Sequence, residues 1–182
     1  MEAHVTLLEK SIPRLQQLDS LYGSRLNTIF STADALEEYV TTADLVIGSV
    51  LIPGGAAPKL VNREMVSRMK RGSVLVDVAI DQGGCFETSK PTTLADPIFT
   101  VDEVVHYCVS NMPGAVARTA TFALNNATLP FVLALANKGY RRALTDDKYF
   151  RDGLNVCRGH LTHAAVARDL GITYTDALNA LT

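Results

Sequence analysis

Short apolar runs alternate with amphipathic stretches through the first half of the chain. Four runs rich in Val, Ile and Leu have the pattern of buried strands, at residues 4–8, 26–30, 44–50 and 74–80. We expect the third of them to be buried on both faces. Apolar residues at helical spacing predict helices between the runs, at residues 12–21, 32–40 and 62–69. Ser11 is a suitable N-cap for the first helix, and Ser31 or Thr32 for the second. This alternation predicts an α/β fold with parallel strands joined by right-handed crossovers.

The second half of the chain has a different pattern, with short expected strands followed by helical segments. Short strands are expected at residues 98–100 and 104–108. Residues 118–137 are rich in Ala and Leu and predict a helix that Gly139 closes, while Pro130 should kink it or split it. The remaining C-terminal residues have the pattern of short helices around a small extended piece.

The stretch SVLVDVAIDQGG, at residues 73–84, combines a buried strand with a polar, glycine-rich turn. Ligands bind at the carboxyl ends of strands in open parallel sheets. Asp81 stands at this end, beside glycines that let a ligand approach the backbone closely, so it is a candidate for chemistry. The alternative is a carboxylate that caps a helix or orders the loop.

Composition narrows the class of protein. The 182 residues are 47% hydrophobic and 20% charged, with a net charge of -2, which is typical of a soluble globular protein. No basic run or aromatic-basic alternation indicates nucleic acid as a partner. No apolar segment is expected to reach the roughly 20 residues of a membrane span, and the N-terminus lacks a signal pattern, so we expect a cytoplasmic protein. Cys85, Cys108 and Cys157 are odd in number and far apart, and we expect reduced thiols.

Three blocks of the sequence resemble alanine dehydrogenase. They are ADLVIGSVLIPGGAAPKLV (43–61), VDVAIDQGGCFETSKPTT (76–93) and VVHYCVSNMPGAVARTATFALNNATLP (104–130). The related transhydrogenase and saccharopine-type dehydrogenases look less similar through DQGG and NMPG. The resemblance implies a partial Rossmann-type doubly wound sheet in residues 1–117, followed by a helical segment of the substrate domain in residues 118–182. It also implies NAD-dependent, reversible oxidative deamination of L-alanine to pyruvate and ammonia, and a homo-oligomer, which in this family is typically a hexamer.

The sequence departs from the family where the cofactor's pyrophosphate should bind. No two glycines are separated by a single residue, so the G-x-G-x-x-G turn is absent. In the family, the half that precedes this sequence also carries the catalytic histidine and the lysine and arginine that bind the substrate carboxylate. We therefore expect a truncated or processed form with little or no catalysis of its own. Without the central first strand, its neighbours would expose unpaired edges that favour oligomerisation or aggregation.

The resemblance assigns roles to particular residues. Asp81 would lie beside the nicotinamide and the substrate, and Glu9 would bind the adenosine ribose and favour NAD over NADP. The other cofactor contacts implied by the resemblance are Arg14, Ser31, Val50, Leu51, Val78, Asn111 and Met112. Each has a plainer alternative. Glu9 could be a solvated strand end, Arg14 an exposed helical residue and Ser31 a helix cap. Val50, Leu51 and Val78 could be core residues, and Asn111 and Met112 part of a structural turn.

The remaining candidates have weaker signals. The spacing of His160 and His163 permits a shared metal, but no carboxylate or cysteine stands at ligand spacing, and a solvated surface pair is expected. His4 and His106 lie in strand patterns and are expected to be packing residues. Cys85 has no basic neighbour in sequence and is given no nucleophilic role. Two alternative functions stay open: a non-catalytic module that docks on itself or on a full-length subunit, and a transhydrogenase- or saccharopine-type relative.

Overall fold

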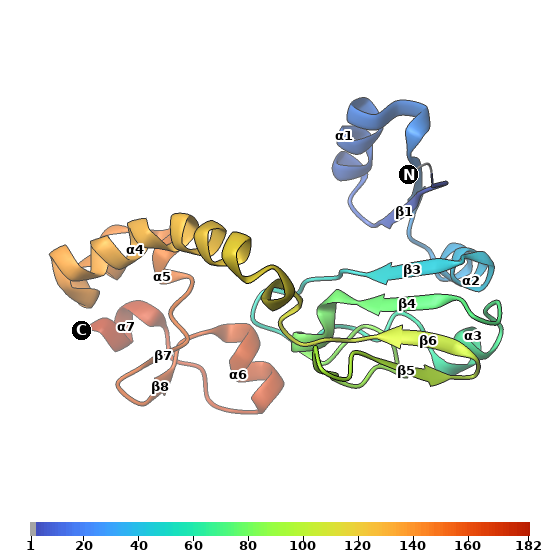
Figure 1. Cartoon of the computed structure of the whole chain (residues 1–182). Coiled ribbons are helices and arrows are strands. Elements are labelled where there is room, and N and C mark those ends of the chain that lie inside the picture. Colours follow the sequence, from blue (N-terminus) through green and yellow to red (C-terminus); the bar gives the residue numbers. More distant parts are fainter. Residues whose placement is uncertain (1–2) are drawn as a thin grey trace. The chain divides into compact units, whose positions relative to one another are not determined.

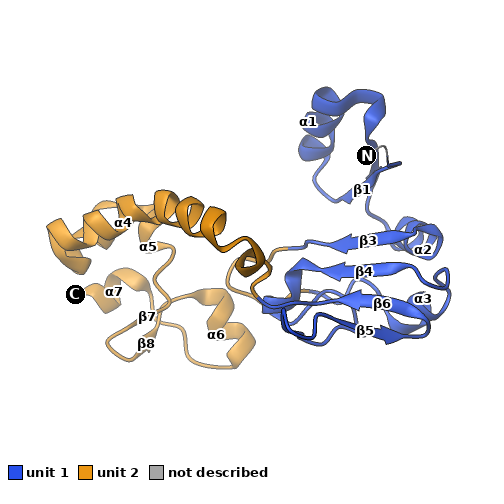
Figure 2. Ribbon diagram, viewed as in Figure 1, with its two compact units in different colours: residues 1–50, 58–110 blue, residues 51–57, 111–182 orange. Residues whose placement is uncertain are grey.

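The computed structural model describes residues 3–182. It divides into two compact units, which are described separately below (Figure 2). Unit 1 consists of Met1–Val50 and Pro58–Ser110, and unit 2 of Leu51–Ala57 and Asn111–Thr182. The domain boundary expected at residue 117 stays a prediction.

Unit 1 begins with a strand, a helix and a second strand. The elements are β1 (Thr6–Glu9), α1 (Ile12–Tyr22), the 3₁₀ helix η1 (Gly23–Arg25) and β2 (Asn27–Phe30). The two strands pair in parallel as a two-stranded sheet, with Glu9 opposite Phe30. Ser11 caps α1 as predicted, because its hydroxyl accepts a hydrogen bond from the Arg14 N–H.

A four-stranded sheet forms the rest of unit 1 (Figure 1). Its strands and the elements between them are α2 (Ala33–Thr42), β3 (Leu45–Gly48), α3 (Arg63–Ser67), β4 (Val74–Asp77), the 3₁₀ helix η2 (Val78–Gln82), β5 (Ile98–Val101) and β6 (Val104–Tyr107). The strand order is β3-β4-β6-β5, in which β4 pairs in parallel with β3 and β6, and β5 is antiparallel to β6. The expected α/β fold with parallel strands is confirmed.

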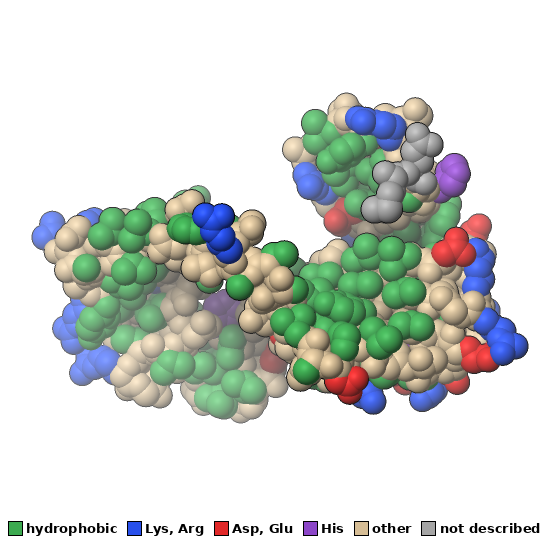
Figure 3. All heavy atoms as spheres, viewed as in Figure 1, with side chains coloured by type: hydrophobic (Ala, Val, Ile, Leu, Met, Phe, Trp, Pro, Cys, Tyr) green, Lys and Arg blue, Asp and Glu red, His purple; other side chains and the backbone are tan. Residues whose placement is uncertain are grey.

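The strands do not form one continuous sheet. In residues 3–182, no strand pair joins β1 and β2 to the four-stranded sheet, so β3 lies at an edge. The expected burial of this strand on both faces is wrong, because the side chains of Leu45 and Ile47 are 53% and 59% exposed. Figure 3 shows hydrophobic side chains gathered on the open face of this sheet. The run at residues 74–80 is also a shorter strand than predicted, since β4 ends at Asp77 and the chain turns into η2.

Unit 2 is mainly helical. Its elements are the 3₁₀ helix η3 (Met112–Val116), α4 (Ala117–Asp146), α5 (Lys148–Arg151), β7 (Val156–Cys157), β8 (His160–Leu161), α6 (Ala164–Leu170) and α7 (Ala177–Leu181). Helix α4 is interrupted at Gly139, where φ is 72° and ψ is 156°, as the predicted helix end requires. Pro130 does not split the helix, because only Gly139 leaves the helical conformation within it. A small core forms around Leu144, Cys157 and Leu181.

One segment of unit 2 passes the length and composition test for a membrane span. Residues 112–146 contain an apolar window with a mean hydropathy of 1.3, none of which is buried. The expectation that no segment approaches this length is therefore wrong. Core helices of soluble proteins can be as long and apolar, but they are mostly buried, unlike this window. The polar pair Asn125 and Asn126 lies inside the segment.

Candidate functional site

A buried carboxylate organises the turn that follows β4. Asp77 ends the strand and is fully buried. Its Oδ2 accepts hydrogen bonds from the Cys85 N–H at 2.9 Å, the Phe86 N–H at 3.4 Å and the Ser89 hydroxyl at 2.5 Å. A buried carboxylate is stable only when its oxygens are paired in this way. Asp77 thus joins the end of the strand to the far side of the turn.

An ammonium group holds the same turn through its carbonyls. Lys59 Nζ donates to the carbonyl oxygens of Gly83 at 2.6 Å, Gly84 at 2.8 Å and Phe86 at 3.3 Å. The Leu60 N–H also donates to the Cys85 carbonyl at 2.7 Å. The segment around Lys59 is therefore attached to the turn by both side chain and backbone.

Asp81 lies within this turn, on η2, and its side chain is exposed. The N–H groups of Gly83 and Gly84 close the turn on the carbonyls of Ile80 and Ala79, each at 3.0 Å. Both glycines have positive φ, and a Cβ at Gly84 would lie 2.7 Å from Asp77 Oδ2. Within residues 3–182, the described hydrogen bonds and ion pairs leave the Asp81 carboxylate unengaged. Loop ordering, the alternative role considered for Asp81, is performed by Asp77.

A second group of predicted residues meets at the ends of β1 and β2. The Ser31 N–H donates to the Glu9 carbonyl at 3.0 Å, which brings these two residues together. Glu9 Oε1 accepts from the N–H groups of Lys10 and Ser11, at 2.7 and 2.9 Å. The cap of α2 is Thr32, whose hydroxyl accepts from the Ala35 N–H, so Ser31 is not the cap.

The other predicted cofactor residues lie at strand ends, on a helix and in a turn. Val78 follows β4 and is 49% exposed, while Leu51, in unit 2, is 70% exposed, so core packing does not account for either side chain. Val50 is partly buried. Arg14 is exposed on α1 and donates to Gln17 at 2.6 Å.

Asn111 precedes Met112 at the start of η3, with a left-handed backbone at φ 57°. Both residues belong to unit 2. A left-handed Asn is typical of a structural turn.

Burial suppresses the acid–base chemistry of the groups behind the turn. Burial, aided by Asp77, raises the pKa of Cys85 to about 12, so this thiol is protonated at neutral pH. Burial also lowers the pKa of His106, whose ring nitrogens lie 3.0 Å from the Val104 carbonyl and 2.7 Å from the Thr88 hydroxyl. His106 is the packing residue that the sequence predicted.

His160 is exposed as expected, whereas His4 and His163 differ from expectation. His4 is exposed and precedes β1, so it is not a packing residue. His163 is partly buried rather than solvated, because it caps α6 by accepting from the Val166 N–H at 3.4 Å. Its ring also occupies the space where a side chain on Gly54 would lie.

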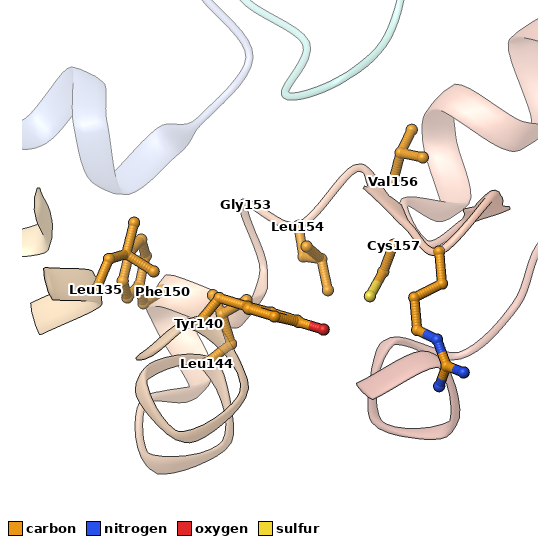
Figure 4. Close-up of a pocket in the computed structure, with 9 residues that line it drawn as sticks. Leu135, Tyr140, Leu144, Phe150, Gly153, Leu154, Val156 and Cys157 are labelled. Carbon is orange, nitrogen blue, oxygen red and sulfur yellow. The ribbon is translucent and has the colours of Figure 1, made fainter. Parts of the chain in front are cut away.

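A pocket lies within unit 2. It has a volume of about 440 Å³ and an apolar lining. Tyr140 and Leu144 line it from α4, and Leu154 and Cys157 from the C-terminal segment (Figure 4). None of the predicted site residues lines this pocket, and it adjoins the small core of unit 2.

Parallel strands with connecting helices, and polar residues after the strands, define a Rossmann-like α/β protein. The chain belongs to the family described as alanine dehydrogenase/PNT, C-terminal domain, whose model matches residues 1–164. The resemblance read from the sequence is thereby confirmed.

Similar proteins and structures carry the same family names. The alanine dehydrogenase of Halomonas elongata is 65% identical over 179 residues, which are 98% of this chain and 48% of that protein. The alanine dehydrogenase of Mycolicibacterium smegmatis is 52% identical over 181 residues, 100% of this chain and 49% of that protein. A solved L-alanine dehydrogenase matches with a TM-score of 0.79 and 48% identity, covering 93% of this chain and 46% of that one. A transhydrogenase from Sinorhizobium meliloti matches with a TM-score of 0.62 and 31% identity, covering 71% of this chain and 36% of that one. The chain spans about half the length of the curated relatives it matches.

Sequence reasoning missed Lys59 and Asp77. For Asp77 the sequence did contain a signal, because a carboxylate at the end of an apolar run needs hydrogen-bond donors close by. Lys59 gave no comparable signal, because its partners lie 24 to 27 residues further along the chain.

Proposed function

We propose that this chain supplies the cofactor-facing half of an NAD-dependent alanine dehydrogenase. The observation that carries the proposal is the exposed, unengaged carboxylate of Asp81 on a turn that hydrogen bonds of Asp77 and Lys59 hold at the carboxyl end of β4. Ligands of open parallel sheets bind at this end, and family membership supplies the chemistry. The complete enzyme would be a soluble, cytoplasmic homo-oligomer.

The residues present fit two parts of a dinucleotide. Glu9 Oε1 is held by two backbone N–H groups, which leaves Oε2 for the adenosine ribose hydroxyls, with Ser31 beside it. This carboxylate favours NAD, because it would repel the 2′-phosphate of NADP. Val50 and Val78 follow neighbouring parallel strands and offer apolar contact on the nicotinamide side. This sequence has no G-x-G-x-x-G turn for the pyrophosphate, which therefore needs residues from outside it.

The reaction converts L-alanine, NAD⁺ and water into pyruvate, ammonium, NADH and a proton. A bound NAD would supply the hydride acceptor for oxidation at the alanine Cα. Asp81 accepts a hydrogen bond from the substrate amino group, or from the water that hydrolyses the imine, and so orients it at the reacting carbon. The family resemblance also assigns cofactor contacts to Asn111, the N-cap of η3, and to Met112, its first residue.

Two measurements test this proposal, first NAD binding and then turnover of L-alanine. Isothermal calorimetry of the 182-residue chain with NAD measures whether the half-site binds cofactor. NADH absorbance with L-alanine then measures turnover, by the chain alone and after addition of the half of the Halomonas elongata enzyme that lies outside the match. We expect little or no turnover by the chain alone, and NADH formation in the mixture.

The variant Asp81→Asn separates a reacting group from a structural one. In the active mixture we expect it to lower turnover about 10²- to 10⁴-fold, the usual contribution of a positioned acid–base group. Asp44→Asn is the matched control, because Asp44 is an exposed carboxylate of unit 1 that pairs with Lys70 at 2.8 Å, on the protein surface. Equal turnover by Asp81→Asn and Asp44→Asn would refute the role of Asp81, and robust turnover by the chain alone would refute its dependence on a second half.

A second candidate is a non-catalytic assembly module that docks on a full-length alanine dehydrogenase subunit. The free edge of β3 and the exposed Leu45 and Ile47 beside it favour this function, because open edges and bare apolar faces pair readily with other chains. Light scattering after size exclusion, with and without the full-length Halomonas elongata enzyme, tests it. A monomer that ignores the full-length enzyme would refute docking.

A further inference from the structure

We propose that Lys59 and Asp77 are positioning residues, a two-sided clamp that sets the geometry of the Asp81 turn. The proposal deepens the proposed function and relies on it for the role of Asp81. The clamp itself is defined by the contacts of unit 1.

The carboxylate side of the clamp closes a loop. Asp77 is the last residue of β4, and its Oδ2 binds the N–H groups of Cys85 and Phe86 and the hydroxyl of Ser89. The chain from Asp77 to Cys85 leaves the strand and includes Asp81. It ends at Cys85, whose N–H binds Asp77 Oδ2. Asp81 therefore occupies the exposed part of a closed loop whose two ends are joined by one buried anion.

The ammonium group of Lys59 binds carbonyl oxygens of the turn, whereas Asp77 binds its N–H groups. Lys59 Nζ carries three N–H donors and has three carbonyl partners in the turn, at 2.6, 2.8 and 3.3 Å. With every donor engaged, this ammonium is occupied with the turn and is not free to bind a substrate carboxylate. A cation on carbonyl oxygens and an anion on N–H groups are each charge-assisted, so they hold the turn more strongly than neutral side chains would.

The clamp also explains the sequence around it. A side chain at Gly84 would lie 2.7 Å from Asp77 Oδ2, 3.0 Å from Ser89 Cβ and 3.4 Å from Ile80 Cδ1. Residue 84 must therefore be small for Asp77 to reach its donors. Among residues 3–182, no described hydrogen bond or ion pair joins the Asp81 carboxylate to Lys59 or Asp77, so its position depends on the backbone that these two residues hold.

Nuclear magnetic resonance of the full 182-residue chain tests the clamp without NAD or substrate. Lys59→Met should speed amide exchange of Gly83 and Gly84 about tenfold, the effect of losing about one net charge-assisted hydrogen bond. It should also shift the ¹³Cγ resonance of Asp81, which Asp81→Asn identifies. Lys59→Arg keeps the charge and should restore most of both signals. Lys70→Met is the matched control, because it removes an exposed lysine of the same unit, and it should change neither signal.

Asp77→Asn provides an independent arm, with faster exchange expected at Cys85 and Phe86. If that variant does not fold, the Lys59 variants still test whether the clamp holds the turn. Unchanged signals at residues 81–84 in Lys59→Met, or the same acceleration throughout unit 1, would overturn the clamp. A clamp that holds while Asp81→Asn leaves NADH formation unchanged would refute the proposed function alone, so the two failures are distinguishable.

Discussion

The two faces of the four-stranded sheet carry similar strand residues in opposite surroundings. On one face, Leu75, Asp77 and His106 are completely buried. On the other, Leu45 and Ile47 are more than half exposed, although both are as apolar as Leu75. Parallel sheets are normally covered on both faces, so the second face of this sheet lacks its usual covering layer in this chain.

The covered face also contains the polar network that shapes the candidate site. Gly48 lies opposite Asp77 in the sheet, and the turn residues Cys85 and Phe86 pack so closely on Gly48 that a Cβ there would lie 2.2 Å from Cys85 Sγ. Burial on this face thus secures the turn that carries Asp81. The contrast teaches that stability and the geometry of the site come from the same side of the sheet.

Truncation of a buried residue gives the largest expected effect. Leu75→Ala removes a fully buried side chain and should lower the free energy of unfolding by about 2–5 kcal/mol. Leu45→Ala is the matched control on the other face, and it should cost well under half as much because Leu45 is already solvated. Urea unfolding followed by circular dichroism measures both. Equal losses would mean that both faces are covered in solution.

Overpacking of the covered face comes next. Gly48→Ala places a methyl group against Cys85 Sγ at 2.2 Å and the Phe86 ring at 2.7 Å, so we expect a loss of about 1–3 kcal/mol. Gly153→Ala is the control, since its Cβ would meet only the Phe150 carbonyl oxygen, at 3.4 Å. A neutral Gly48→Ala in the same urea assay would contradict the close packing of the turn on β3.

The sequence predicted the strands better than their surroundings. Apolar runs located β1 to β4, and the position of Asp81 at a strand end followed from the polar turn after such a run. The burial of Leu75 and the exposure of Ile47 were not predictable, because both lie in equally apolar runs and only the tertiary neighbours differ.

The candidate site was predictable only in part, for a similar reason. The sequence located Asp81 from one local pattern, whereas the contacts of Lys59 with Gly83 and Phe86 join segments that no local pattern relates. Residue type alone also did not point to Asp77, which orders the loop from inside the core. Roles that depend on contacts between distant segments can be assigned only from the folded structure.

The covered face should also respond to pH through His106. Burial lowers the pKa of His106 from its ordinary value of 6.5, so the unfolded state binds more protons at acidic pH. The stability present above pH 6.5 should be lost as the pH falls through the folded-state pKa, by at most about 1.4 kcal/mol per pH unit. Urea unfolding at several pH values measures this slope, which His106→Gln should flatten and the exposed control His4→Gln should not. An unchanged slope in His106→Gln would assign the acid sensitivity to other groups.

The smallest effect is expected on the uncovered face. Ile47→Lys exchanges an apolar side chain that is 59% exposed at an edge strand for a charged one, and the free energy of unfolding should change by no more than about 0.5 kcal/mol. Light scattering should show less self-association, because a lysine on an edge strand opposes pairing with another chain. A loss of several kcal/mol would instead mean that a second copy covers this face in solution. Since the change leaves Lys59 and Asp77 untouched, the amide exchange of Gly84 should stay at its wild-type rate, separating the uncovered face from the turn that holds Asp81.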